Sequence, residues 1–345
     1  MLTSKNENPV ATQVLAGEVV TGWDASERLP SRLESFSILK QRTEIFTDWL
    51  KLIGAKNPDK RQAKIINSLD VCGEFLIFRE YTSANRTRLI GGCTCKKHLL
   101  CAFCASRRGV KNTQAYKEKF NQLQAENPNL DIYFLTFTVK NGADLSERFI
   151  HLRSAMQSLL KNRNHQAASH RKIKTEMFKF IGGVFAYEFK RGSGENLWHP
   201  HIHMLALLPK GLRCDVEELK KEWLEITGDS SVINIQQATN DSAFLEVFAY
   251  ALKFSEMEFI DRWFAAELLR NERLISSFGE VRGVVVDESD YDELLAAHEP
   301  YFDMIFKWSN ARYIQQHYVE HNSEKEQLNR ENALMCSAAL ACTQG

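Results

Sequence analysis

The sequence contains none of the long apolar runs that mark membrane-spanning proteins. No stretch of its 345 residues approaches the run of about 18 apolar residues that a membrane helix needs. The opening segment, MLTSKNENPVATQVLAGEVV, also lacks the order of basic and then apolar residues that is typical of a signal peptide. With 44% hydrophobic and 26% charged residues, the composition indicates an ordinary globular protein, which we expect in the cytoplasm.

The sequence also has no excess of charge of either sign. Its formal net charge is zero, because the 44 Lys and Arg residues balance the 44 Asp and Glu residues. A zero average argues against a nucleic-acid-binding protein, since phosphate binding usually leaves a basic excess. The charges are nevertheless segregated along the chain. Basic residues dominate residues 96–119 and 161–179, whereas residues 283–306 contain acidic residues and no Lys or Arg. Each charge run is equally typical of a solvated helix face, so the pattern leaves both interpretations open.

Cysteine is concentrated in one short segment. Four of the eight cysteines lie within twelve residues, at Cys93, Cys95, Cys101 and Cys104. In a reducing compartment such a cluster is better explained by metal binding than by disulfides. The spacing of Cys95, His98, Cys101 and Cys104 predicts a tetrahedral zinc site, with Cys93 as a substitute ligand. The alternative is that Cys101 and Cys104 are buried thiols and that no metal is bound.

Three basic residues, Arg107, Arg108 and Lys111, follow the cysteine cluster directly. A turn organised by zinc would aim these cations at DNA phosphates. Such contacts provide affinity without base specificity.

The middle of the chain alternates strand and helix patterns. Apolar, β-branched runs predict strands, and the turn-rich segment RGSGENLW between two of them predicts a hairpin. The predicted strands are residues 131–140, 182–190, 199–209 and 231–236, and the predicted helices are residues 146–162, 216–226 and one that begins at 241 or 242. These elements indicate an α+β fold in which helices pack on a sheet.

The segment HPHIHM contains three alternating histidines, His199, His201 and His203. The period of two in a strand places all three side chains on one face, where they can bind one divalent cation. Cations that act on phosphates usually take oxygen ligands too, and Glu188, across the predicted hairpin, is the natural candidate. The alternative is that the histidines are packed in a core or lie on a solvated strand.

The predicted helix DSAFLEVFAYALKF places Glu246, Tyr250 and Lys253 on its polar face, opposite an apolar arc. A tyrosine phenolate there can attack a phosphate and form a 5′-phosphotyrosine. Lys253 would lower the pKa of the tyrosine or stabilise developing charge, and Glu246 would act as a general base. The helix alone is equally consistent with a surface tyrosine.

Taken in order, three segments resemble the motifs of the HUH endonucleases, specifically the replication initiators of small rolling-circle plasmids. They are FLTFTV (134–139), HPHIHML (199–205) and EVFAYALK (246–253). The upstream segment CKKHLLCAFCASRRGVK (95–111) resembles the cysteine-rich segment that precedes these motifs in that group. The resemblance covers about residues 70–310, and four motifs in order are far more specific than the short histidine element alone.

The resemblance implies a role for each matching residue. The paired metal ligands would be His201 and His203 together with Glu188, while the first of the three histidines lies outside the minimal pair of the family. Tyr250 would be the nucleophile. Glu246 matches the glutamate that helps a water molecule end the reaction cycle in single-tyrosine initiators, and this helix contains no second tyrosine.

The resemblance and the sequence patterns together predict the domain organisation. We expect a flexible arm over residues 1–35, a helical, cysteine-rich zinc- and DNA-binding region over 36–125, an HUH nickase domain over 126–256 and a helical C-terminal region over 257–345. The histidine strand would be central in an antiparallel sheet, with the tyrosine helix beside it. The implied cofactors are catalytic Mg²⁺ or Mn²⁺ and structural Zn²⁺. The implied partners are plasmid origin DNA, duplex and single-stranded, and a helicase and polymerase of a bacterial host.

Two other functions stay open at the level of sequence. A transposase or a conjugative relaxase would use the same chemistry on different DNA. A nucleic-acid-binding regulator would bind through the cysteine cluster and the basic stretches, with the histidines holding a structural ion. Such a regulator has no need of Glu246, Tyr250 and Lys253 on one polar helix face, and this favours the enzyme.

Overall fold

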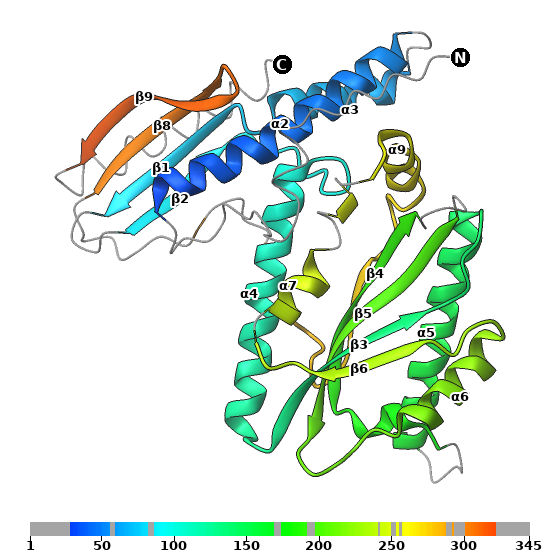
Figure 1. Ribbon diagram of the computed structural model, residues 1–345. Helices are drawn as coiled ribbons and strands as arrows, with labels where there is room; N and C mark the ends of the chain where they lie inside the picture. Colours follow the sequence, from blue (N-terminus) through cyan, green and yellow to red (C-terminus); the bar gives the residue numbers. More distant parts are fainter. Residues whose placement is uncertain are drawn as a thin grey trace. The chain divides into compact units, whose positions relative to one another are not determined.

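The computed structural model describes residues 28–55, 59–81, 86–168, 174–191, 197–240, 242–249, 253–254, 257–287, 292 and 301–321. These residues form two compact units (Figure 1). Unit 1 contains the described residues up to Gln41, those within Gly73–Cys93, and residues 292 and 301–321. Unit 2 contains the described residues within Arg42–Cys72 and Thr94–Asp290. Among the described helices, none has the length and apolar character needed to cross a membrane.

Unit 1 is built on a four-stranded antiparallel sheet with the strand order β2-β1-β8-β9. Its strands are β1 (Phe75–Tyr81), β2 (Arg86–Gly92), β8 (Tyr301–Ser309) and β9 (Arg312–His321). The first part of helix α2 (Leu29–Gly54) also belongs to this unit. Phe36 of α2 packs on Phe78 of β1, with ring centroids 6.1 Å apart, so the helix shares its core with the sheet.

Two predictions about the ends of the chain are wrong in the part that the structure describes. Helix α2 begins at Leu29, so the last residues of the predicted flexible arm (1–35) are helical, and residues 1–27 lie outside the described part. The predicted helical C-terminal region (257–345) contains α9 (Phe259–Leu268), but its later described segments are strands. Strand β8 pairs with the distant strand β1, and such long-range pairing is invisible in a local pattern of aromatic residues.

The polar centre of unit 1 is a buried ion pair between neighbouring strands. Arg79 of β1 and Asp303 of β8 are register partners, and the guanidinium donates to both carboxylate oxygens over 2.8 and 3.1 Å. The Arg79 guanidinium also lies 3.7 Å from the ring centroid of Tyr301. Both charged residues are buried and have lost their hydration, so each charge is stabilised by the opposite charge of its partner.

Unit 2 is built on a five-stranded antiparallel sheet with the strand order β6-β3-β5-β4-β7. Its strands are β3 (Leu130–Thr138), β4 (Gly182–Arg191), β5 (Trp198–Pro209), β6 (Ile233–Gln237) and β7 (Ile275–Gly279). Its helices are the rest of α2, α3 (Lys60–Val71), α4 (Ala102–Glu126), α5 (Leu145–Ala168), the 3-10 helix η1 (Glu176–Lys179), α6 (Val216–Thr227), α7 (Ser242–Phe248) and α9. The predicted mixed α+β fold, the β4–β5 hairpin and the central position of the histidine strand β5 are confirmed.

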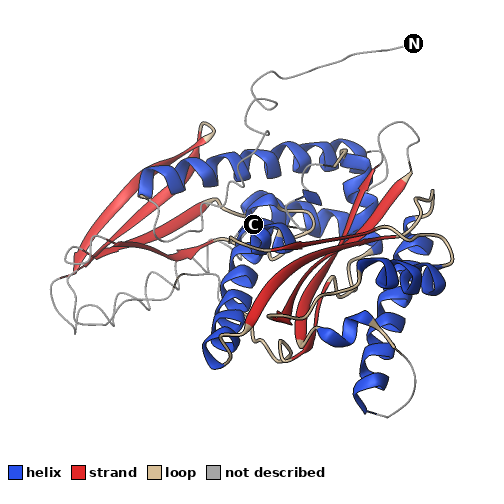
Figure 2. Ribbon diagram, turned by 60° about the horizontal axis from the view of Figure 1, so that its bottom comes forward, coloured by secondary structure: helices blue, strands red, loops and turns tan. Residues whose placement is uncertain are grey.

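Different helices cover the two faces of this sheet (Figures 1 and 2). On one face, Phe149 of α5 contacts Tyr187 of β4, and Trp223 of α6 lies on Phe137 of β3. Helix α7 lies on the other face, where Glu246 is near His203. The histidine strand is therefore covered by apolar packing on one side and faces α7 on the other.

Helices α4 and α7 approach each other closely. Tyr116 of α4 stacks on Phe248 of α7 with ring centroids 5.1 Å apart, and Phe120 contacts Phe244 edge to face at 5.3 Å. At Gly109 of α4, an added Cβ would lie only 3.0 Å from the Phe248 carbonyl oxygen. A residue with a side chain at this position would push the two helices apart.

Replacing Asp303 with Asn is expected to lower the free energy of unfolding by about 3–5 kcal/mol, because the Arg79 guanidinium stays buried without its counter-charge. Urea denaturation would measure the loss, and hydrogen exchange at β1 and β8 amides would place it in unit 1. Arg312→Gln, which removes an exposed charge from β9 of the same sheet, is the control and is expected to change stability by less than about 0.5 kcal/mol. Equal effects of the two substitutions would contradict a stabilising role for the pair.

Candidate metal centres and active site

Strand pairing brings Glu188, His201 and His203 onto one face of the unit 2 sheet. Glu188 of β4 is directly opposite His201 of β5, and His203 is the next residue of β5 on that face. On its other side, His203 is opposite Thr136 of β3. Because side chains alternate along a strand, these residues point toward the same face of the sheet.

The three side chains converge on one small volume. Glu188 Oε1 lies 3.1 Å from His201 Nε2, and Glu188 Oε2 lies 3.5 Å from His203 Nε2. One potential ligand atom from each residue lies within 4.8 Å of the other two. Glu188 is only 1% exposed. Two imidazoles and one carboxylate can therefore hold a metal ion here.

The far nitrogen of each imidazole is already engaged, which leaves the near nitrogen facing Glu188. His201 Nδ1 lies 3.3 Å from the His199 carbonyl oxygen, and since a carbonyl only accepts, Nδ1 carries the hydrogen. His203 Nδ1 lies 3.2 Å from Thr136 Oγ1. In the neutral ring of His201, Nε2 then presents a lone pair to the Glu188 carboxylate. Two such acceptors need a proton or a metal cation between them, as in the oriented histidines of metal sites.

Glu188 Oε1 is buried, and His201 Nε2 and Lys190 Nζ each lie 3.1 Å from it. Within the described residues neither contact has the geometry of a hydrogen bond, so this oxygen keeps a lone pair for a cation. Burial opposes ionisation of Glu188, but His201, Lys253 and His203 outweigh it and hold the pKa of this carboxyl below its ordinary value. Burial, together with His201 and Lys253, lowers the pKa of His203 to about 4 against the attraction of Glu188. An ionised carboxylate beside a neutral imidazole is the protonation state that binds metal.

A lysine and a second carboxylate border this centre. Lys253 Nζ lies 2.7 Å from Glu188 Oε2 and 2.6 Å from Glu246 Oε1. Glu246 Oε1 is also 3.6 Å from His203 Nε2, and its side chain is 47% exposed. Burial disfavours the charged form of Lys253, but Glu188 and Glu246 outweigh this effect and raise its pKa, so the side chain stays an ammonium. Tyr250, the predicted nucleophile, lies outside the described residues.

His199 lies beside the centre and is not one of its three convergent residues. Its Nδ1 lies 2.6 Å from Asn141 Oδ1, which holds the ring on the exposed side. Burial, with the charges of His201 and Lys190, lowers the pKa of His199. Lys190 also reaches the centre, with Nζ 3.1 Å from Glu188 Oε1.

A second group that can hold a metal consists of four cysteine sulfurs in unit 2, Cys72, Cys95, Cys101 and Cys104. The Sγ–Sγ distances are 3.5 Å for Cys72–Cys101, 3.6 Å for Cys72–Cys104 and 3.6 Å for Cys95–Cys104. With zinc–sulfur bonds of about 2.3 Å, tetrahedral geometry places sulfurs about 3.8 Å apart. The observed spacing is therefore close to that of a four-thiolate zinc site.

The fourth member of this group differs from the prediction. The structure supplies Cys72, at the end of α3, where the sequence analysis expected His98 or Cys93. The imidazole of His98 instead borders two cavities, and burial together with Arg108 lowers its pKa. Cys93 belongs to unit 1, outside the unit that contains the cluster. Cys72 was missed because β1 and β2 separate it from the other three cysteines in sequence.

The surroundings of the cluster favour negative charge on Cys101, whereas hydrogen bonds to the neighbouring sulfurs, together with burial, raise the pKa of Cys72 and Cys95. Burial opposes ionisation of Cys101, but hydrogen bonds from Cys104, Cys72 and Cys95 outweigh it and lower the pKa of its thiol. Cys101 is also the N-cap of α4 and accepts from the Cys104 backbone N–H. The buried Arg262 donates to the Leu100 carbonyl oxygen over 2.7 Å and brings a positive charge to this region.

The three predicted DNA-binding cations lie in different environments. Arg107 is only 6% exposed, and Lys111 pairs with Asp287 at 2.8 Å. Arg108 lines a cavity next to the cysteine loop, the segment 95–101 between the second and third cluster cysteines. Of the three, Arg108 thus borders one of the cavities found among the described residues.

Known proteins match much of this chain. A family model described as a replication protein matches residues 86–314, which include Glu188, His201, His203 and three of the four cluster cysteines. No solved structure matches the chain significantly.

Several curated relatives of this chain carry the name Protein rep. One from Bacillus sp is 30% identical over 180 residues, which is 50% of this chain and 52% of the relative. One from Streptococcus pneumoniae serotype 2 (strain D39 / NCTC 7466) is 27% identical over 146 residues, 42% of each chain. One from Bacillus amyloliquefaciens is 26% identical over 212 residues, 59% of this chain and 53% of the relative. The chain thus spans about half the length of the curated relatives it matches.

Glu188→Gln is expected to weaken Mn²⁺ binding by more than the roughly 10–100-fold that is typical of losing an outer hydrogen-bond partner of a ligand. Thr136→Val, which removes the partner of His203 Nδ1, should fall within that smaller range, because it only loosens the imidazole. Titration of free Mn²⁺ by electron paramagnetic resonance would measure both. His199→Ala is the control and should bind nearly normally. Unchanged affinity in Glu188→Gln would remove Glu188 from the ligand set.

Cys72→Ser and Cys104→Ser are each expected to release about one equivalent of zinc and to lower the thermal midpoint of unfolding, since structural zinc contributes directly to folding. His98→Ala should keep its zinc, because His98 is not in the sulfur group. Elemental analysis of the purified variants decides between the two ligand sets. Cys214→Ser, at a free cysteine outside the cluster, controls for the loss of a thiol. Zinc loss in His98→Ala with retention in Cys72→Ser would restore the ligand set expected from sequence.

Proposed function

The chain belongs to the replication protein family, and from its candidate active site we propose that it starts plasmid replication by nicking one strand of origin DNA. The nick would leave the 5′ end of the strand joined to Tyr250, and the reverse reaction would rejoin the strand. This is the chemistry of the single-tyrosine HUH endonucleases, which the motifs of the sequence resemble. The enzyme would therefore act as a rolling-circle initiator.

The observation that carries this proposal is the convergence of Glu188, His201 and His203 with Glu246 and Lys253. Three protein ligands leave an open coordination position, which is typical of a catalytic ion and not of a structural one. The added ammonium and the half-exposed carboxylate bring charges of both signs to the edge of the centre, where a substrate phosphate can reach them. Tyr250 lies in the sequence between these last two residues.

We assign Mg²⁺ or Mn²⁺ to Glu188, His201 and His203, because hard cations take a carboxylate and imidazole suits the transition metals. When bound, the cation would polarise the scissile phosphate and offset charge that develops on its oxygens. The soft thiolates of the cysteine cluster suit Zn²⁺ instead. That zinc would be structural, since all four positions around it are filled by sulfur.

In the proposed nicking step, the Tyr250 phenolate attacks the scissile phosphorus. A bond forms between the phenolic oxygen and phosphorus, and the bond from phosphorus to the 3′ oxygen breaks. The electron pair of the broken bond leaves on the 3′ oxygen, which takes up a proton to become a hydroxyl. Lys253 is held as an ammonium by two carboxylates, so its role would be to stabilise the phenolate or donate that proton, and not to act as a base.

Glu246 would end the cycle. Its carboxylate is half exposed and can accept a proton from a water molecule that attacks the phosphotyrosine. The water oxygen then bonds to phosphorus and the bond to Tyr250 breaks, which frees the enzyme after one plasmid length. A host helicase and a host polymerase would extend the free 3′ end in between.

Two other assignments predict different behaviour. A transposase or a conjugative relaxase would form the same adduct but on DNA other than a plasmid replication origin. A zinc-containing regulator would bind origin DNA without forming a covalent adduct. Incubation of the protein with labelled origin DNA and Mn²⁺ separates these outcomes.

Tyr250→Phe is expected to reduce adduct formation and nicking of single-stranded origin DNA to background, because the attacking oxygen is removed. Zinc content and DNA affinity should be unchanged. Tyr187→Phe is the matched control and should nick normally, since Tyr187 packs on Phe149 on the opposite face and burial raises the pKa of its phenol. Denaturing gel electrophoresis with labelled DNA measures the adduct. An adduct in Tyr250→Phe would mean that another residue is the nucleophile.

Glu246→Ala is expected to keep nicking and adduct formation but to lose termination, because an unassisted water molecule attacks a phosphodiester slowly. The visible product would be multimeric single-stranded plasmid DNA in cells that carry the variant. Glu217→Ala, at an exposed glutamate in the first turn of α6, is the control and should give unit-length circles. Normal termination by Glu246→Ala would leave Glu246 only as an ion-pair partner of Lys253.

A further inference from the structure

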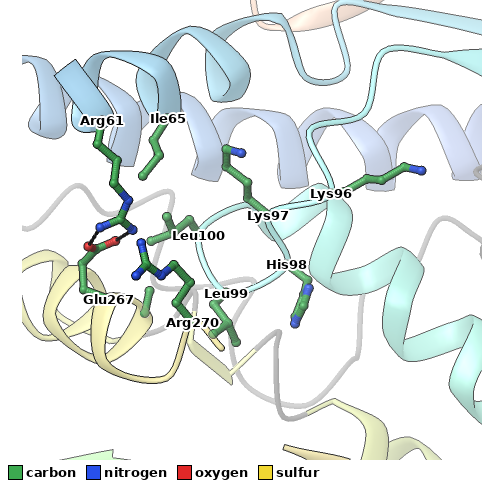
Figure 3. A pocket seen from close by; sticks show the side chains of 10 residues that line it. Arg61, Ile65, Lys96, Lys97, His98, Leu99, Leu100, Glu267 and Arg270 are labelled. Carbon is green, nitrogen blue, oxygen red and sulfur yellow. Dashed lines mark hydrogen bonds and ion pairs between the residues drawn. The ribbon is translucent and has the colours of Figure 1, made fainter. Parts of the chain in front are cut away.

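Two neighbouring cavities border the cysteine loop in unit 2. The smaller has a volume of about 270 Å³ and is bordered by Lys97, Arg270 and the ion pair of Arg61 with Glu267 (Figure 3). The larger has a volume of about 530 Å³ and lies between α4 and the segments around 269–275 and 284–286. His98, Leu99 and Arg270 line both, so the two cavities share one basic edge.

The larger cavity combines apolar walls with buried donors that find no acceptor among the described residues. Leu99, Leu274 and Ile275 contribute to the walls. Asn112 of α4 is 2% exposed, and within the described residues its Nδ2 has no hydrogen-bond partner. One helical turn away, Arg108 Nε is buried and likewise without an acceptor in the described part of the chain. Buried donors of this kind are rare in folded proteins, and here they indicate where the acceptor atoms of a ligand belong.

The rim of the two cavities is basic. Arg270 and Arg273 are exposed at the larger cavity. The two acidic residues that border the cavities are already paired, Glu267 with Arg61 and Glu272 with Arg153. The remaining arginines are therefore available to an anionic ligand.

The larger cavity is connected to the elements of the candidate active site. Its wall residue Leu274 accepts a hydrogen bond from the backbone N–H of Tyr187, the residue before Glu188, over 2.9 Å. Tyr116, on the α4 side of the cavity, stacks on Phe248 of α7, the helix that contains Glu246. A ligand in the cavity would thus lie against both β7, the neighbour of β4, and the helix that packs on α7.

We propose that the larger cavity binds one unpaired nucleotide of the DNA strand that the enzyme cleaves. Its base would lie between the apolar walls and accept hydrogen bonds from Asn112 and Arg108, and the adjoining phosphates would contact Arg270 and Arg273. A nucleotide matches all three features of the cavity. Its flat ring fits the apolar walls, its acceptor atoms fit the buried donors, and its phosphates fit the basic rim. The proposal rests on the proposed function, and it adds a subsite that reads a base beside the cleavage centre.

Fluorescence anisotropy without added divalent metal ions tests the subsite, because binding is then measured without cleavage. The probes are labelled twelve-nucleotide strands of dA or of dT and an abasic strand of equal length, which carries the same phosphates without bases. The wild-type protein is expected to bind at least one base-bearing strand about tenfold more tightly than the abasic strand. Asn112→Leu should lose about five- to tenfold in affinity for that strand and nothing for the abasic strand.

Further variants separate the contributions. Asn112→Ala removes the donor and adds neither bulk nor charge, so it should lose the same base preference even if the leucine variant folds poorly. Arg270→Gln and Arg273→Gln should weaken binding of all strands to a similar extent, since they contact phosphates. Arg213→Gln, which removes an exposed charge outside both cavities, is the matched control and should bind normally.

Equal affinity of the wild-type protein for base-bearing and abasic strands would overturn the proposal, as would equal losses for both strands in the Asn112 variants. Tight binding of free dAMP that depends on Asn112 and is not displaced by the strands would assign the cavity to a free nucleotide instead. The same preparations are tested for the covalent adduct with Mn²⁺. Normal adduct formation without base preference refutes the subsite alone, and base preference without any adduct refutes the proposed nicking function alone.

Discussion

A carboxylate buried in the middle of a sheet, Glu188, is the constraint on which the candidate active site depends. A charge so far from water must be matched by nearby positive charge or by strong donors. His201 faces it from the paired strand, His203 from the next position on that strand, and Lys253 from beyond α7. The register of β4 against β5 fixes the first two contacts, and the placement of Lys253 depends on α7 packing on this face.

The cysteine cluster imposes an equivalent constraint on the segments around α4. It joins the end of α3 to the cysteine loop and the first turn of α4, from which β1 and β2 separate it in sequence. A metal ion there would fix the direction in which α4 leaves the cluster. The loop between the cysteines has little other regular structure, and the positive φ of Lys96, 57°, is the conformation of a tight turn. The two centres are thus built by different means, one by strand register and the other by the convergence of cysteines from a helix end, a loop and a helix start.

Much of the sheet of unit 2 and of the Glu188 centre could be predicted from sequence, because alternation along a strand is a local property. The positions of His201 and His203 follow from a period of two, and Glu188 follows from the length of the hairpin turn. Contacts between distant segments could not be predicted in this way. Cys72 lies near Cys95 only because the chain between them forms the paired strands β1 and β2 and then returns. Strand β8 is buried against β1 by pairing that no local pattern encodes, and so its residues were assigned to a helical region.

The close approach at Gly109 means that α4 also positions α7. The N-terminal end of α4 is anchored at Cys101, and its middle touches the Phe248 carbonyl oxygen and the Phe248 ring, so one rigid rod connects the sulfur cluster to the helix that contains Glu246. The position of the Glu246 carboxylate is therefore set partly by the helix that starts at the cysteines and not by the sheet alone. A substitution in the cysteine cluster that shifts the start of α4 would therefore also be felt at α7, although the two sites share no side chain.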